Sequence, residues 1–393
     1  MSFLLGVLIF IVALLVSIML HEAGHFVTAK KFGMKVTQFF VGFGQTLWSR
    51  TRGETEYGVK AFLVGGFVKI SGMTQLEEIE PEDEPRTFRR HPWWQRVIVL
   101  IAGSFMHFAF ALVLLFVLAA AVGMPVAAST TVSSVDSCVP ASMSAGCGQG
   151  NPASPAKRAG IKAGDKIIAI AGAPVHGWAQ MGQVIRRQHP GTPIAITVDR
   201  RGQRLTLHAA LATVHGRTGS FLGVSSVPVY QRSGPAGAAS YAVQQFGQAI
   251  VGSAQLAASL PGAVPDLFSK NRANTPAGQV TSVIGMGDVT GQVIASRIAW
   301  QSKVSLVLLI VASLNIFVGA FNLLPLLPLD GGHLAVVIFE RMRTWLAKLR
   351  GRPDPGPVDF RRLVPVSVGV FALLVGLGVL LIMADLVNPV HIL

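Results

Sequence analysis

The strongest constraint on the fold of this chain is an apolar run from Phe3 to Leu20, which is long enough to cross the hydrocarbon of a bilayer. The run ends directly at a His-Glu-x-x-His pattern over residues 21–25. Imidazole and carboxylate groups are costly within or beside hydrocarbon and usually have a function there. We therefore interpret this polar cluster by its position at the end of an apolar segment as well as by its pattern.

The spacing of the cluster predicts a metal site. On a helix, His21 and His25 are four residues apart and share one face, so their two rings can hold one zinc ion. Glu22 lies between them and can take a proton from the attacking water. These residue types at this spacing indicate hydrolysis. A catalytic zinc commonly has three protein ligands, so a third ligand is expected elsewhere in the chain.

The composition is typical of an integral membrane protein. Hydrophobic residues make up 51% of the 393 residues and charged residues only 13%, outside the range of ordinary soluble domains. Four stretches are long enough to span a bilayer, at residues 3–20, 97–123, 303–324 and 364–386. A secretory signal peptide is the alternative for the first stretch, but no basic segment precedes it and no small-residue cleavage site follows.

The distribution of charge predicts the orientation in the membrane. Eleven of the 33 basic residues lie between the first two spans and seven lie between the last two, so both loops are expected in the cytoplasm. The long segment 124–302 and both termini are then outside. The net charge of +14 does not indicate nucleic-acid binding, because no aromatic-rich basic patch accompanies it.

The outside segment contains a pattern that resembles a PDZ domain of the bacterial protease type. Residues 159–167 read Ala-Gly-x-x-Ala-Gly-Asp-x-Ile, and residues 199–203 have a hairpin pattern. Such domains bind peptides along a sheet edge, although a spacer without a ligand is the alternative. Cys138 and Cys147 lie before it, as a disulfide or as two free thiols. Moderately amphipathic helices outside the membrane are expected over residues 239–300.

The third span leads to a candidate for the missing ligand. Asp330 follows Pro325 and Pro328, which disfavour a continuous helix, and precedes two glycines. The first and third spans both run from outside to inside, so their ends reach the same membrane depth. We predict that Asp330 is the third ligand. The alternative is an aspartate that only begins a turn.

Together these residues resemble the site-2 protease family of intramembrane zinc metalloproteases, and a single-PDZ member of the regulator of sigma-E protease type in particular. The resemblance implies a polytopic α-helical membrane protein with four transmembrane helices, a membrane-associated β-hairpin around residues 57–70 and an extracytoplasmic PDZ domain. The implied segments are an N-terminal membrane half at 1–125, the PDZ domain with its linker at 126–225, an extracytoplasmic helical segment at 226–302 and a C-terminal membrane half at 303–393.

The resemblance also implies roles for single residues. His21, His25 and Asp330 would hold Zn²⁺, and Glu22 would be the catalytic base. Asn322 and the glycines of the hairpin, Gly65 and Gly66, would hold the unwound substrate. The implied substrates are single-pass membrane proteins, namely anti-sigma factors or remnant signal peptides, cut in regulated intramembrane proteolysis in the bacterial plasma membrane. The lipid bilayer and a peptide or protein ligand of the PDZ domain are further implied partners, and nucleic acid is not.

The chain departs from the family pattern at three places. Leu327 and Leu63 stand where proline is usual, and His107 stands at the asparagine of a Gly-Pro-x-x-Asn pattern. We expect His107 to form hydrogen bonds within the helix bundle, the alternative being an approach to the metal site. A PDZ-bearing membrane scaffold with an inactive site is the competing function, and the complete set of ligands argues against it.

Overall fold

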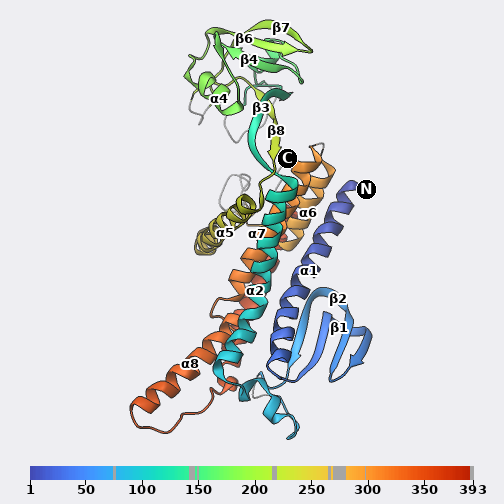
Figure 1. The fold of residues 1–393 in the computed structure, drawn as a ribbon, viewed down its shortest axis with the longest axis vertical. Coiled ribbons are helices and arrows are strands. Elements are labelled where there is room, and N and C mark those ends of the chain that lie inside the picture. Colours follow the sequence, from blue (N-terminus) through green and yellow to red (C-terminus); the bar gives the residue numbers. More distant parts are fainter. Residues whose placement is uncertain are drawn as a thin grey trace. The chain divides into compact units, whose positions relative to one another are not determined.

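A computed structural model describes residues 1–73, 77–140, 147, 150–214, 219–263, 267–268, 280–296 and 298–389. The chain forms two compact units (Figure 1). We call Met1–Ala119 with Pro235–Leu393 the membrane unit, and Ala120–Gly234 the sheet unit. Parts of the predicted linker and of the predicted helical segment 226–302, including residues 269–279, lie outside the described residues.

Four helices of the described residues are long and apolar enough to cross a membrane, as the sequence predicts. They are α1 (Ser2–Lys31), α2 (Trp93–Val117, continued by a π-helical turn over Leu118–Val122), α7 (Trp300–Asn322) and α9 (Val364–Val387). Because α1 continues past the apolar run, the His-Glu-x-x-His pattern lies inside a regular helix.

The first cytoplasmic loop of the predicted topology folds into an antiparallel sheet of β1 (Val36–Arg52) and β2 (Thr55–Ile70). Both strands bend. Residues 36–41 of β1 therefore pair with residues 66–70 of β2 along one edge, and residues 38–41 pair with residues 56–59 of β2 along the other edge. Gly65 and Gly66, the glycines of the predicted hairpin, lie within β2, and the turn between the strands falls at residues 53–54. Residues 66–70 form an outer edge of the sheet, with one ladder partner among the described strands.

An apolar cluster joins this sheet to the helices. It is formed by buried residues of α1, the two strands, α2 and α8 (Asp330–Leu349) together with Met34 and Phe88: Ala29, Met34, Val36, Ile70, Phe88, Val99, Leu100 and Val337. Short 3-10 turns at Glu84–Arg86 and Phe88–Arg90 precede α2, and another at Phe360–Arg362 precedes α9. The cluster fixes the inner end of α1 against the elements that carry the other site residues.

Two further helices of the membrane unit are α5 (Pro235–Ala263) and α6 (Val283–Ala295). α5 packs on α2 and α7 through Ala242. α6 lies along the start of α1, where a Cβ on Gly6 would come within 2.6 Å of the carbonyl oxygen of Thr290. The amide of Ser282 donates to Asp385 of α9 at 2.6 Å, which holds the beginning of α6. α6 therefore packs alongside the first span, a placement that the sequence pattern did not predict.

The sheet unit is built on a six-stranded antiparallel sheet of order β7-β6-β4-β3-β8, with β5 paired to β4. Its elements are β3 (Met124–Val135), α3 (Pro155–Arg158), β4 (Lys166–Ile170), β5 (Ala173–Pro174), α4 (Trp178–Arg187), β6 (Pro193–Arg200), β7 (Gln203–Ala210) and β8 (Val224–Gln231). Met181 of α4 packs with Ile167, Ile170 and Ile196 in the core. Cys138 and Cys147 form a disulfide, the first of the two alternatives open from the sequence.

One buried ion pair holds the predicted PDZ pattern together. The Asp165 side chain is 1% exposed and accepts hydrogen bonds from the Arg200 guanidinium at 2.7 and 2.8 Å. The amide of Lys162 also donates to it at 2.8 Å. Arg200 lowers the pKa of the Asp165 carboxyl, so the ionised form is the stable one in the folded unit. The aspartate of the motif therefore links the turn before β4 to the end of β6.

We expect Asp165→Asn to destabilise the sheet unit by about 2 kcal/mol, because it leaves a guanidinium with a neutral partner. Amide hydrogen exchange over β4 and β6 in the full-length protein measures the loss. Because the folded pKa of Asp165 is lowered, its contribution is present above the unfolded value of about 4 and is lost as the pH falls below it. The difference between variant and parent should thus shrink on acidification. Asp199→Asn, at a half-buried carboxylate that accepts from the Gly202 amide at the β6–β7 turn, is the control, and an equal effect there would contradict the assignment.

Candidate metal centre

Three predicted ligands from two distant parts of the chain meet at one point. His21 and His25 lie on one face of α1, and Asp330 is the first residue of α8. Nε2 of His21 and Nε2 of His25 are 3.1 Å apart, and they lie 3.3 and 3.2 Å from Oδ2 of Asp330. All three side chains are largely shielded from solvent. The sequence prediction that these residues share one site therefore agrees with the geometry.

The spacing of the three atoms fits a tetrahedral zinc site. Zinc binds nitrogen and oxygen ligands at about 2.0–2.1 Å, which places neighbouring ligand atoms of a tetrahedron about 3.3 Å apart. The observed separations of 3.1–3.3 Å match this edge length. Three protein ligands at three corners leave the fourth corner for water or substrate, as in catalytic rather than structural zinc sites.

The hydrogen bonding around the rings also indicates a cation. Nδ1 of His25 lies 2.7 Å from the carbonyl oxygen of Val99, which only accepts, so the proton of the neutral ring is on Nδ1. Nε2 of His25 therefore presents a lone pair to His21 and to Asp330. Oδ2 of Asp330 is buried and receives no hydrogen bond from the described residues. Converging lone pairs repel one another unless a cation lies between them, and these residues fit zinc.

Glycines make the close approach of the helices possible. A Cβ on Gly103 of α2 would come within 2.5 Å of Cε1 of His21, and one on Gly24 would come within 2.5 Å of the carbonyl oxygen of Ala102. A Cβ on Gly332 would come within 2.5 Å of the Leu327 amide nitrogen, in the turn between α7 and α8. The backbone of α2 thus forms the wall behind the rings, and the Gly-Gly pair lets α8 begin against the turn that positions Asp330.

The edge of the β1–β2 sheet lies beside Glu22. A Cβ on Gly66 would be 3.4 Å from Cγ of Glu22 and 3.3 Å from Sδ of Met19, so the outer strand passes directly along α1. Gly65, the neighbouring predicted substrate residue, contacts the Phe43 ring instead. Glu22, the three candidate ligands and a strand edge therefore share one region.

Asn322, the third predicted substrate residue, is the last residue of α7 and is half-buried. Its side-chain amide makes no hydrogen bond with any other residue that the structure describes. The turn of residues 323–329 separates it from Asp330, so both residues lie at the junction of α7 and α8.

A polar network behind the rings was not predicted. Asn315 of α7 is fully buried, and its Oδ1 lies 2.8 Å from Nδ1 of His107, while its amide donates to Ser17 at 2.9 Å and to the carbonyl oxygen of Val311 at 2.8 Å. His107 thus bonds within the bundle, as expected, but its ring centre is also 5.0 Å from that of His21. The sequence contains a signal for this network, because Ser17 and Asn315 are polar residues inside two apolar runs.

Comparison with known proteins supports the same chemistry. Residues 9–352 match peptidase family M50. The chain is 36% identical over 415 residues to the zinc metalloprotease Rip1 of Mycobacterium tuberculosis, covering all of both chains. It is also 36% identical over 416 residues to zinc metalloprotease Rip1 of Mycolicibacterium smegmatis, again over the full length of both. Each relative is named as a zinc enzyme.

The tight contact at Gly103 yields a prediction. We expect Gly103→Ala to displace the rings of His25 and His21, at a strain of about 1–3 kcal/mol. If that strain acts on the metal-holding arrangement, zinc affinity falls about 5- to 150-fold. Elemental analysis and competition with a zinc chelator measure the change. Gly369→Ala in α9 has open space around it and is the control. Unchanged zinc affinity in Gly103→Ala would show that α2 does not shape the centre.

Proposed function

The chain belongs to peptidase family M50, the site-2 protease family of zinc metalloproteases, and from this membership we propose that it cuts the transmembrane segments of single-pass membrane proteins. The observation that carries the proposal is the convergence of His21, His25 and Asp330 at the end of a spanning helix, with a free strand edge beside Glu22. Lipid-embedded substrates reach such a site without leaving the membrane.

The residues of the site divide the chemistry between them. His21, His25 and Asp330 hold zinc, which when bound makes water more acidic and polarises the scissile carbonyl. Glu22, one residue from a ligand on the same helix, accepts the proton of the attacking water and returns it to the leaving nitrogen. Val99 keeps the His25 ring in the tautomer that leaves Nε2 free to bind.

The strand edge supplies what a helical substrate lacks. A peptide bond inside a helix is shielded by its neighbouring turns, so the substrate must become extended before water can attack it. Residues 66–70 have one ladder partner in the described sheet, and an extended segment can pair with their other side by strand addition. Gly66 lets that segment approach Glu22 closely, and we propose that the amide of Asn322, which has no hydrogen-bond partner among the described residues, binds its backbone.

The sheet unit fits a role in substrate selection outside the cytoplasm. Its Asp165 motif and its β4–β7 strands carry the pattern that resembles a PDZ domain. We place this unit on the outer side of a bacterial plasma membrane, where it binds a peptide tail or excludes bulky substrates. Anti-sigma factors and remnant signal peptides, cut in regulated intramembrane proteolysis, are the substrate classes that we propose.

Two variants separate catalysis from metal binding. Glu22→Gln should keep zinc but lower cleavage by about two to four orders of magnitude, because it removes the proton acceptor without touching a ligand. Asp330→Ala should lose zinc and cleavage together. Proteomic comparison of membrane-protein fragments from cells carrying the parent or Glu22→Gln protein identifies the substrates, and elemental analysis gives the zinc content. Undiminished cleavage by Glu22→Gln would refute its assignment as the base, and full zinc content in Asp330→Ala would indicate another ligand.

The strand-addition step makes a separate prediction. We expect Gly66→Val to lower cleavage of the identified substrates more than tenfold while zinc content stays unchanged, since the added side chain fills the space between β2 and Glu22. Ala61→Val, an exposed position on the same strand, should cleave normally. The yield of substrate fragments is measured with each variant and compared with the yield from the parent protein. Normal cleavage by Gly66→Val would show that the substrate does not pass along this edge.

A further inference from the structure

Helix α8 carries an apolar face that no described part of the chain covers. After Val337, which is 2% exposed, the large apolar side chains of the helix are open to the surroundings, with exposures from 39% to 65%: Ile338, Phe339, Met342, Trp345, Leu346 and Leu349. At 100° per residue these six positions fall within an arc of about 120°. Scattered surface hydrophobics are ordinary, but a continuous stripe over three turns marks an interaction surface.

Cationic side chains border both edges of this stripe. On the same helical projection, the exposed Lys348 lies along one edge, and the exposed Arg350 lies along the other, just beyond the helix end. Arg341 and Arg343 also flank the stripe, but their guanidinium groups turn to the Trp93 ring and to the carbonyl oxygens of residues 355 and 356. No acidic residue of α8 lies within the stripe or at its borders, since Asp330 is at the helix start and Glu340 is on the opposite face. An apolar stripe bordered by Lys and Arg is typical of helices that lie in the interface of an anionic membrane.

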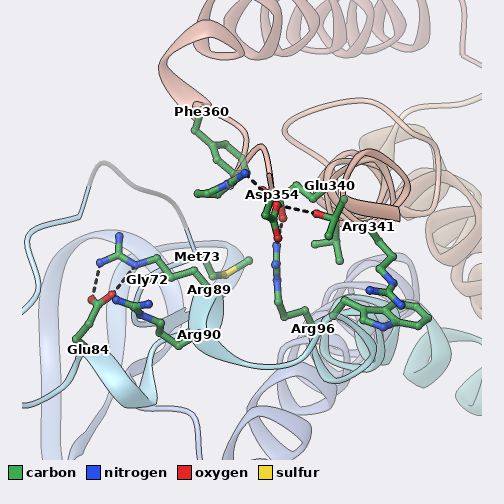
Figure 2. Close-up of a pocket in the computed structure, with 15 residues that line it drawn as sticks. Gly72, Met73, Glu84, Arg89, Arg90, Arg96, Glu340, Arg341, Asp354 and Phe360 are labelled. Carbon is green, nitrogen blue, oxygen red and sulfur yellow. Dashed lines mark hydrogen bonds and ion pairs between the residues drawn. The ribbon is translucent and has the colours of Figure 1, made fainter. Parts of the chain in front are cut away.

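The opposite face of α8 is already occupied, which fixes the rotation of the helix (Figure 2). Glu340 accepts from Arg96 of α2 at 2.8 Å, with both side chains 14% exposed, and also accepts from the amide of Val358 at 2.9 Å. The Arg341 guanidinium lies 5.8 Å from the centre of the Trp93 ring. These contacts surround a charged cavity of about 540 Å³ on this side of the helix. The apolar stripe must therefore face away from α2.

Other residues at this end of the membrane unit place it near a membrane surface. Trp93 and Trp94 begin α2 and are 44% and 45% exposed, and tryptophan is enriched where hydrocarbon meets water. The spanning helix α7 ends eight residues before α8, and the spanning helix α9 begins at Val364. α8 itself carries too much charge to span. It thus lies between two spans at the side where both meet the interface.

We propose that α8 lies in the interface of the leaflet at this end of the spans, with its apolar stripe among the acyl chains and with Lys348 and Arg350 on the phosphates of anionic phospholipids. Charge complementarity favours this partner over a second protein, because an exposed cation lies at each edge of the stripe, as a phosphate surface requires. The inference depends on the chain spanning a membrane and not on its peptidase activity. It also ties the helix that begins with Asp330 to the depth of the leaflet.

Spin labels test the proposal on the full-length protein in vesicles of phosphatidylcholine with a minority of phosphatidylglycerol. The two cysteines of the chain form a disulfide, so an introduced cysteine is the free thiol available for labelling. A label at Met342→Cys on the stripe should be several-fold more accessible to oxygen than to an aqueous nickel chelate. A label at Ala347→Cys, on the other side of the helix, should show the reverse. Each variant must retain the parent's zinc content.

Two outcomes would overturn the inference. If the nickel chelate reached the label at Met342→Cys as readily as oxygen does, the stripe would lie in water. If that label were shielded from both reagents, and the shielding disappeared on dilution into excess lipid, the partner would be another protein. The charge component has its own test, because Lys348→Glu with Arg350→Glu should reduce the depth of the label in the anionic vesicles and leave it unchanged in phosphatidylcholine alone. Equal depth in the anionic vesicles would refute the role of the cations.

Discussion

Close packing of α1 against α2 is the constraint on which the rest of the structure depends. Gly24 and Gly103 allow a close approach of the two helix backbones, which restricts the orientation of the two histidine rings. The carbonyl oxygen of Val99 then fixes the His25 ring by a hydrogen bond. The apolar cluster beneath holds the β1–β2 sheet and the start of α8 to the same helix pair. The base, the strand edge and the third ligand all take their positions from this contact.

The resulting centre explains how a membrane can contain a hydrolytic site. Its polar groups satisfy one another in pairs: His107 with Asn315, Asn315 with Ser17, and His25 with Val99. Buried polar groups without partners are costly, so such a network lowers the cost of placing imidazoles inside a helix bundle. Oδ2 of Asp330, which receives no hydrogen bond from the described residues, is one of the atoms that a metal would use.

Much of this arrangement could be predicted from the sequence. The four spans and the ligand triad follow from apolar length, from the spacing of His21 and His25, and from the break before Asp330, because these depend on local geometry and membrane depth. The bent register of β1 with β2 could not be predicted, since it depends on which of several similar strand segments pair. Neither could the course of α6 along α1 nor the role of Asn315, because both arise from long-range packing of small or isolated residues.

The two-part origin of the centre gives it a mechanical asymmetry. Both imidazoles and the Glu22 carboxylate are fixed to one continuous helix and move as a single rigid body, whereas Asp330 begins a second helix joined to its span through a short proline-containing turn. Tilting of the first helix would carry three of the four groups together and preserve their mutual distances. A displacement of the second helix would change the coordination geometry itself. Regulation of this enzyme would therefore have its largest effect through the position of that helix.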